Sequence, residues 1–326
     1  MTTRVCARWA RTALGIVTIL GAVGCGSATE EEGTGSGAGP TGPTAPTGPV
    51  TPPPPLPITT WVDVENGSLP LVLIAPHGGD LAPADVPDRT CTGCVLGNDT
   101  NTRALALAIA AAFEVRVNRR PFLVVNRLTR RKFDGNRDLL EATGGHLPLE
   151  AFWNLYQERI DSAVAGARRV HPRALVIDLH GHGHAVPRLE IGYLTSATSL
   201  RLADSLLGPM VGQSSIAGLN RTAVSGDSGA VLLRGPRALG SRFRALGFPS
   251  VPSDFDPAPL VGQDYFNGGY NTVRRGSVTG GAVDAIQIET HYTGVRDTPE
   301  SRFAFAEAFV TAILAYLQDH YGWRPL

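Results

Sequence analysis

From about residue 58 onward, the chain alternates between short apolar runs and longer stretches with helical periodicity. Short runs of aliphatic and β-branched residues bounded by Gly, Pro or Asn are typical of strands. They lie at 59–65, 69–75, 121–125, 174–179, 283–289 and in the alternating run that ends at Leu194. Apolar spacing near 3.6 residues, or Ala/Leu-rich sequence, predicts helices at about 100–113, 150–168, 196–207, 237–246 and 299–320. We therefore expect an α/β domain.

The first two strand-like runs are separated by Asn66-Gly67, a dipeptide that favours tight turns. They are predicted to form a hairpin or two neighbouring strands.

A histidine cluster follows the buried run at 174–179. His180, His182 and His184 alternate with glycines, which allow sharp turns and close approach to a ligand. In open α/β sheets, chemistry gathers just beyond the carboxyl ends of such strands. The histidines indicate either a metal site or a loop bonded to hydroxyl and carbonyl groups. Asp178, on the same side of the strand as His180, could orient a ligating imidazole, which favours the metal site.

A second histidine lies in the same position relative to a strand. His77 follows the run at 69–75 and is itself followed by two glycines and Asp80. Asp99 precedes the first helix and could be either its N-cap or a carboxylate at the mouth of the site. Asp80 competes for the second of these roles.

Two further features could take part in chemistry. The segment 126–138 carries several arginines and follows a strand in irregular sequence, so it could bind an anionic group. Glu289 ends the apolar run 283–289, where an unpaired buried carboxylate is costly. It is either a functional carboxylate or a structural partner of an arginine such as Arg274.

The first 57 residues do not have the composition of a folded domain. Residues 1–25 combine three arginines with a short apolar run and end in Ala-Val-Gly-Cys, which predicts an export signal of the lipoprotein type, with Cys25 as the lipidated residue. Residues 26–57 are rich in Gly, Thr and Pro and predict a disordered linker. Residues 58–326 remain as a single domain. We expect a protein of the cell envelope, in the periplasm or at the outer membrane, attached to the membrane by a lipid.

Charge and cysteine content add two expectations. The formal net charge is zero and no basic stripe with interleaved aromatic residues is present, so nucleic acid is not an expected partner. Cys91 and Cys94 are the cysteines of the predicted domain, and in an exported protein a short disulfide is expected from their spacing.

Several segments together resemble the N-formylglutamate amidohydrolase family and, more distantly, the zinc carboxypeptidases. The segments, which fall in order within 70–290, are PHGGD (76–80), FDGNRD (133–138), IDLHGHGH (177–184) with PRLEIGY (187–193), GGYNTVRRG (268–276) and AIQIET (285–290). The resemblance implies a three-layer α/β/α fold around a mixed, mostly parallel sheet, of the zinc-carboxypeptidase or phosphorylase/hydrolase type. It also implies one zinc ion at the strand ends.

The resemblance further assigns roles to individual residues. His77 and His180 would be metal ligands, and Glu289 would be the catalytic carboxylate. Asn136 and Arg137 would hold a substrate carboxylate. The remaining two candidates are Arg130, for the carbonyl oxygen, and Arg188, for substrate binding.

The third metal ligand is where the sequence departs from the carboxypeptidases. Those enzymes use a glutamate three residues after the first histidine, and Asp80 occupies that place here. The formylglutamate-like pattern more often has an acid at the start of the following helix, which is Asp99. We prefer Asp99.

These residue types suit hydrolysis of an amide next to a carboxylate. Two imidazoles and one carboxylate leave zinc an open position for water, a neighbouring carboxylate can transfer the proton, and guanidinium groups can stabilise an oxyanion. We expect an exported zinc amidohydrolase acting on an N-acyl amino acid or a small peptide with a carboxylate. The alternatives are a non-catalytic binding lipoprotein on the same fold and a metal-dependent esterase or carboxypeptidase.

Overall fold

The computed structural model describes residues 57–325. The predicted signal segment and all but the last residue of the predicted linker lie outside this range. None of the helices in 57–325 is both long and apolar enough to cross a membrane.

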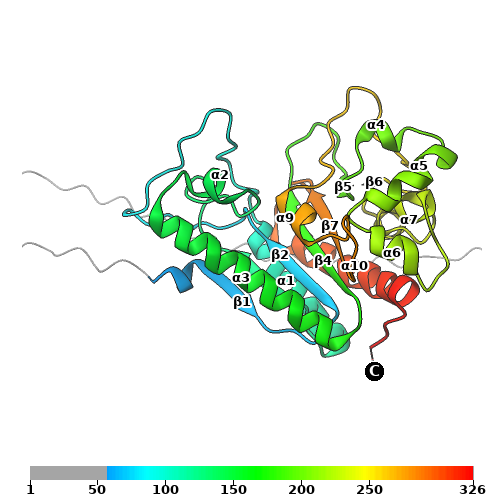
Figure 1. Cartoon of the computed structure of the whole chain (residues 1–326), viewed down its shortest axis with the longest axis horizontal. Helices are drawn as coiled ribbons and strands as arrows, with labels where there is room; N and C mark the ends of the chain where they lie inside the picture. The colour runs from blue at the N-terminus through cyan, green and yellow to red at the C-terminus, as the bar shows by residue number, and fades with distance from the viewer. Residues whose placement is uncertain (1–56, 326) are drawn as a thin grey trace, which may run out of the picture. The chain divides into compact units, whose positions relative to one another are not determined.

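A seven-stranded mixed sheet forms the centre of the domain (Figure 1). The strands follow one another across the sheet in the order β1-β3-β2-β4-β7-β5-β6. The four central strands β3, β2, β4 and β7 are parallel, whereas β1 and β5 run antiparallel to their neighbours β3 and β7. The bounds are β1 Val62–Glu65, β2 Leu71–Ala75, β3 Phe122–Asn126, β4 Ala174–Gly181, β5 Leu189–Gly192, β6 Ser250–Val251 and β7 Val283–Thr290.

The predicted pairing of the first two strands is wrong. β3 lies between β1 and β2, and the turn at Gly67 crosses the start of β3. Ser68 N donates a 2.9 Å hydrogen bond to Arg120 O, and a Cβ added at Gly67 would lie 2.3 Å from the backbone nitrogen of Phe122. The glycine is therefore needed for close packing between two segments and not for a hairpin turn.

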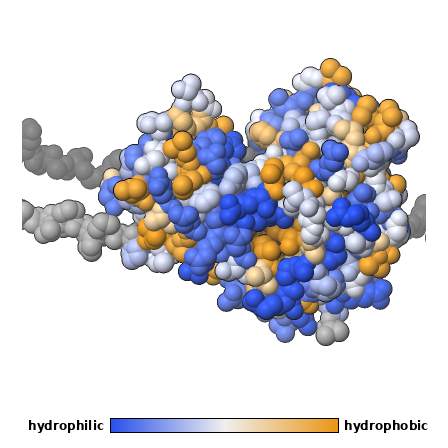
Figure 2. Space-filling model, in the orientation of Figure 1, coloured by the Kyte–Doolittle hydropathy of each residue, from blue (hydrophilic) through white to orange (hydrophobic). Residues whose placement is uncertain are grey.

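Helices cover both faces of the sheet, which confirms the predicted three-layer α/β/α architecture. On one face, α3 (Leu147–Val170) packs on β2 and β3, and α2 (Leu139–Thr143) and α9 (Tyr270–Arg275) lie beside it. On the other face, α1 (Thr102–Val117) packs against α10 (Pro299–Tyr316), which a turn of π-helix extends through Tyr321. Figure 2 shows hydrophilic residues gathered near the middle of the face in view, with apolar residues scattered around them.

Five short helices lie between β5 and β6 in the sequence, and the last of them, α8, packs against α10. They are α4 Ala197–Leu200, α5 Asp204–Met210, α6 Ala217–Thr222, α7 Ala230–Arg234 and α8 Leu239–Ala245. The single helix predicted at 196–207 is divided into α4 and α5, because Ala203 adopts an extended backbone conformation between them. The helix predicted at 237–246 corresponds to α8.

Strand register brings polar side chains together at the carboxyl ends of the central strands. His180 of β4 is opposite Glu289 of β7, and Glu190 of β5 is opposite the same Glu289. Residues opposite each other in adjacent strands project to the same face. Three polar residues from strands distant in sequence therefore face the same side at one edge of the sheet.

Candidate metal and catalytic site

Three buried side chains converge where β2 and β4 end and α1 begins. Asp99 Oδ2 lies 3.3 Å from His77 Nδ1 and 3.2 Å from His180 Nδ1. One ligand atom from each residue lies within 4.8 Å of the others. Two donors bound to the same tetrahedral zinc at about 2.0–2.1 Å are themselves roughly 3.3 Å apart. The donor set and its spacing therefore fit a metal ion.

The backbone around Asp99 explains why this residue reaches the site. Its amide N–H donates to His77 O at 3.1 Å, and its carbonyl accepts from Thr102 N and Oγ1. The N-cap of α1 is Asn101, in a left-handed conformation, so the predicted N-cap role of Asp99 is wrong. Because its side chain does not cap the helix, the Asp99 carboxylate faces the histidines.

Asp80 lies apart from this cluster. It is exposed, and its carboxylate forms no hydrogen bond with the other residues of 57–325. Among the described residues, the group that could hold a metal beside His77 contains Asp99 and not Asp80.

The second nitrogen of each histidine faces another buried carboxylate. His77 Nε2 lies 2.5 Å from Asp134 Oδ1, and His180 Nε2 lies 3.1 Å from Asp178 Oδ1. A carboxylate at Nε2 holds the proton there and leaves the Nδ1 lone pair for a metal, as is common for metal-ligating histidines. Asp178 was expected in this role. Asp134 was not, although it lies within the FDGNRD segment that contributed to the resemblance.

The charges at this point favour a cation. Burial opposes a positive charge on His180, but Asp178, Asp99 and Glu289 outweigh that effect and hold its pKa well above the ordinary value. Although burial opposes it, the pKa of Asp99 is held well below its usual range by His77 and His180. A metal ion would supply the positive charge that these protons otherwise provide.

Glu289 lies beside this group with one oxygen free. Its Oε1 accepts a 2.9 Å hydrogen bond from Gln287 Nε2, whereas Oε2 is buried and has no partner within 57–325. Burial raises the pKa of Glu289 to about 8; the surrounding carboxylates add to the shift and His180 opposes it. Arg274 instead contacts Asp161 and Tyr270, so the structure does not support an ion pair between Arg274 and Glu289.

A cavity of about 420 Å³ opens over these residues and includes Arg130, Arg137 and Asn136 in its wall. Arg130 Nε donates to Asp134 Oδ2 at 3.0 Å, and Arg137 Nε donates to Glu141 Oε1 at 2.7 Å. The Nη2 groups of both arginines form no hydrogen bond with other described residues.

Asn136 is held in place by α9. Its Oδ1 accepts from Asn271 N at 2.8 Å, whereas its Nδ2 only contacts His180 Nε2, at 3.3 Å, because both nitrogens carry protons. A Cβ added at Gly269 would lie 2.4 Å from Asn136 Nδ2, so only glycine fits there.

Arg188, the remaining predicted substrate-binding residue, lies outside this cavity. Its guanidinium is almost fully buried and is paired with Asp256 Oδ2 at 2.9 Å. It lines a separate pocket with Phe255 and Arg244. The ion pair directs the side chain away from the metal-ligand group.

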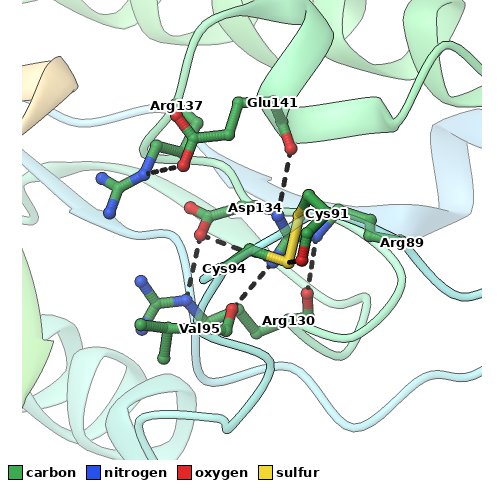
Figure 3. The surroundings of a disulfide bond; sticks show 8 residues. All are labelled: Arg89, Cys91, Cys94, Val95, Arg130, Asp134, Arg137 and Glu141. Atoms are coloured by element: carbon green, nitrogen blue, oxygen red, sulfur yellow. Dashed lines mark hydrogen bonds and ion pairs between the residues drawn. A yellow bond between two sulfur atoms is a disulfide. The ribbon is translucent and has the colours of Figure 1, made fainter.

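The predicted disulfide between Cys91 and Cys94 is present and belongs to a loop beside the cavity (Figure 3). The fully buried Arg89 fixes this loop: it donates to the carbonyl oxygens of Val95, Arg130 and Glu141 at 2.9–3.1 Å. The disulfide loop, the Arg130 segment and α2 are thus held to one another by a single guanidinium.

Comparisons with known proteins are limited to structure. No protein-family model and no curated protein matches the sequence. The chain is similar to the crystal structure of N-formylglutamate amidohydrolase from Ralstonia eutropha JMP134, at 17% identity over 78% of this chain and 96% of that chain, with a TM-score of 0.46. A zinc-free apo structure of YNDL is similar at 13% identity over 79% and 89%, with a TM-score of 0.32.

The first of these structures comes from the family that the sequence motifs resemble. Similarity at this level supports no conclusion on the activity of this chain. The geometry of the site itself therefore carries the conclusions on function.

The two candidate carboxylates can be separated by their effect on metal affinity. We expect Asp99→Asn to weaken binding of Zn²⁺ by more than tenfold, because it removes a charged ligand atom that faces both histidines. Asp80→Asn is the matched control and should leave the affinity unchanged. Titration with Zn²⁺ against a competing chelator measures both, and the reverse order of effects would assign the ligand to Asp80.

Asp134 should act on the metal through His77. Asp134→Asn keeps the shape of the side chain but removes the charge that holds the proton on His77 Nε2, so we expect a 10–100-fold loss of Zn²⁺ affinity. The same chelator competition measures it. Asp88→Asn, which changes a half-buried carboxylate paired with Lys132 in the neighbouring loop, is the control. Wild-type affinity in Asp134→Asn would show that the 2.5 Å contact does not influence metal binding.

Proposed function

We propose that this protein is a zinc-dependent amidohydrolase that cleaves an amide bond in an N-acyl amino acid or small peptide carrying a carboxylate. The observation that carries the proposal is Glu289, which lines the cavity together with His77, Asp99 and His180 and whose buried Oε2 has no partner among residues 57–325. A proton-transferring carboxylate needs an oxygen that no hydrogen bond already holds.

Each of the cavity residues has a separate role in hydrolysis. When bound, zinc would lower the pKa of the attacking water and polarise the substrate carbonyl. Glu289 takes a proton from that water and delivers it to the leaving amine. Arg130 stabilises the negative charge that develops on the carbonyl oxygen. Arg137, with Asn136 beside it, binds the substrate carboxylate through its free Nη2 group.

We also propose that the protein acts outside the cytoplasm. The supporting feature is the N-terminal sequence, with its three arginines, short apolar run and Cys25. A lipid on Cys25 would attach the domain to a membrane through the segment 26–57.

The function is tested by metal analysis and a substrate screen on one preparation. We expect about one zinc per chain, loss of activity on chelation and recovery when Zn²⁺ is returned. Dipeptides and N-acyl amino acids should be hydrolysed and matched esters without the amide should not be preferred. Stoichiometric zinc with tight substrate binding and no turnover would identify the binding-protein alternative, and faster turnover of esters would identify an esterase.

Glu289→Gln distinguishes a catalytic from a structural carboxylate. The change keeps the shape and a hydrogen-bonding group but removes the base, so kcat should fall by a factor of about 10²–10⁴ while zinc content is retained. Turnover and zinc content are measured on the same preparation.

The stability of the metal-free variant gives a second measurement. The folded-state pKa of Glu289 is raised to about 8, so an ionised Glu289 destabilises the fold, increasingly as pH rises from about 4.5 to 8. The Tm of metal-free Glu289→Gln should therefore exceed that of the wild type, and the difference should grow over this range. Unchanged kcat with a lowered Tm would assign Glu289 a structural role.

A further inference from the structure

A second histidine–carboxylate pair lies in the cavity wall and takes no part in the steps described so far. His184 Nδ1 lies 2.9 Å from Glu190 Oε1, and the fully buried Glu190 uses its other oxygen to accept from Phe266 N at 2.7 Å. The ring of Phe266 packs on the imidazole with centroids 4.5 Å apart. The pair is thus fixed from two directions.

The tautomer of the neutral His184 ring follows from its partner. A carboxylate oxygen only accepts hydrogen bonds, so Nδ1 carries the proton and the neutral ring has its lone pair on Nε2. Nε2 forms no hydrogen bond with any residue of 57–325 and is not enclosed by protein. His184 is part of the cavity wall. It therefore offers an acceptor to whatever fills the cavity.

This pair is not a second metal site. His182, His184 and Glu190 each have a ligand atom within 4.8 Å of the others. However, His182 Nδ1 accepts from His184 N at 3.1 Å, and its Nε2 donates to Arg188 O at 2.7 Å. A ligating nitrogen needs a free lone pair, and His182 has none left.

The sheet order fixes where the pair lies along the cavity. Arg130 follows β3, His77 follows β2, His180 is on β4, Glu289 is on β7 and Glu190 is on β5. Glu289 is thus located between the metal-ligand group and the His184–Glu190 pair. With the substrate carboxylate on Arg137, the carbonyl oxygen at Arg130 and the amide at Glu289, the acyl side is left for the part of the cavity wall that His184 lines.

We propose that His184 accepts a hydrogen bond from an amino group on the acyl side of the substrate. The inference rests on the proposed amidohydrolase function and specifies its substrate class as a dipeptide-like compound with a free amino group. A carboxylate on the acyl side of the substrate would be repelled by the lone pair on His184 Nε2 and by the negative charge of Glu190. An ammonium group would instead find an acceptor in Nε2 and the negative charge of the nearby buried Glu190.

Two compounds that differ only by this amino group test the proposal: glycyl-L-glutamate and N-acetyl-L-glutamate. The ratio of their kcat/KM values is independent of the fraction of active enzyme. In zinc-loaded wild type the glycyl compound should be favoured by a factor of about 10–100, the range for a hydrogen bond to a charged group. Equal values, or a preference for the acetyl compound, would overturn the proposal.

Variants at His184 show whether this residue causes the preference. His184→Phe keeps a ring but removes both nitrogens, so the ratio should fall to about 1. His184→Gln places an amide oxygen near the position of Nε2 and should retain part of the preference. A preference that persists in His184→Phe would overturn the assignment, and His184→Leu, which also removes both nitrogens, replaces His184→Phe if that variant does not fold.

Binding separates failure of this inference from failure of the proposed function. Calorimetric titration of both compounds into zinc-loaded Glu289→Gln, with and without His184→Phe, needs no turnover. If neither compound is hydrolysed by the wild type, the amidohydrolase proposal fails for these substrates. At least tenfold tighter binding of the glycyl compound, lost with His184→Phe, would still support the role of His184. Equal or absent binding would overturn it.

Discussion

The structure depends on how buried negative charge is compensated at one edge of the sheet. Five buried carboxylates gather there: Asp99, Asp134, Asp178, Glu190 and Glu289. Each of these residues is at most 6% exposed. Carboxylates removed from water are tolerated only when positive charge or hydrogen bonds compensate them. The two site histidines, Arg130 and several N–H groups provide part of this compensation. The remaining imbalance is what a metal cation at the Nδ1 atoms of the histidines would correct.

Two buried arginines hold the loops that carry these carboxylates. Arg89 donates to three carbonyl oxygens around the disulfide loop. Arg296 donates to the carbonyls of Thr290, Thr100 and His182, which joins the end of β7, the segment before α1 and the histidine loop. A Cβ on Gly181 would lie 2.3 Å from the Arg296 guanidinium carbon. The glycine next to His180 therefore makes room for the arginine that fixes the loop.

A site residue could be predicted where its own stretch of sequence marks it, and could not where only contacts with distant residues do. His77, His180 and Glu289 each end an apolar run, so a strand-end argument finds them from the sequence alone. Asp134 and Glu190 were not assigned roles, because one lies in an irregular segment and the other is the polar member of an alternating strand. Only three-dimensional contacts show what they face.

The same distinction explains the errors in the fold. Helix periodicity and buried strands are local patterns and agree closely with the structure for α3, β4 and β7. Strand order is not local: β3, some fifty residues downstream, separates β1 from β2, and this pairing overrides the Asn66-Gly67 turn signal. Arg188 was misplaced for a similar reason, since its partner Asp256 lies 68 residues away in the sequence.

The unpaired oxygen of Glu289 also bears on whether the domain is a catalyst or a binding protein. A buried polar atom without a partner costs about 1–3 kcal/mol, and a charged one costs more. A glutamine at position 289 would still accept the hydrogen bond from Gln287 and would bury no charge. Packing alone therefore gives no reason for a carboxylate here. Binding a substrate carboxylate would also be hindered by a negative charge. Proton transfer requires a free carboxylate oxygen, and local destabilisation of this kind is characteristic of functional sites.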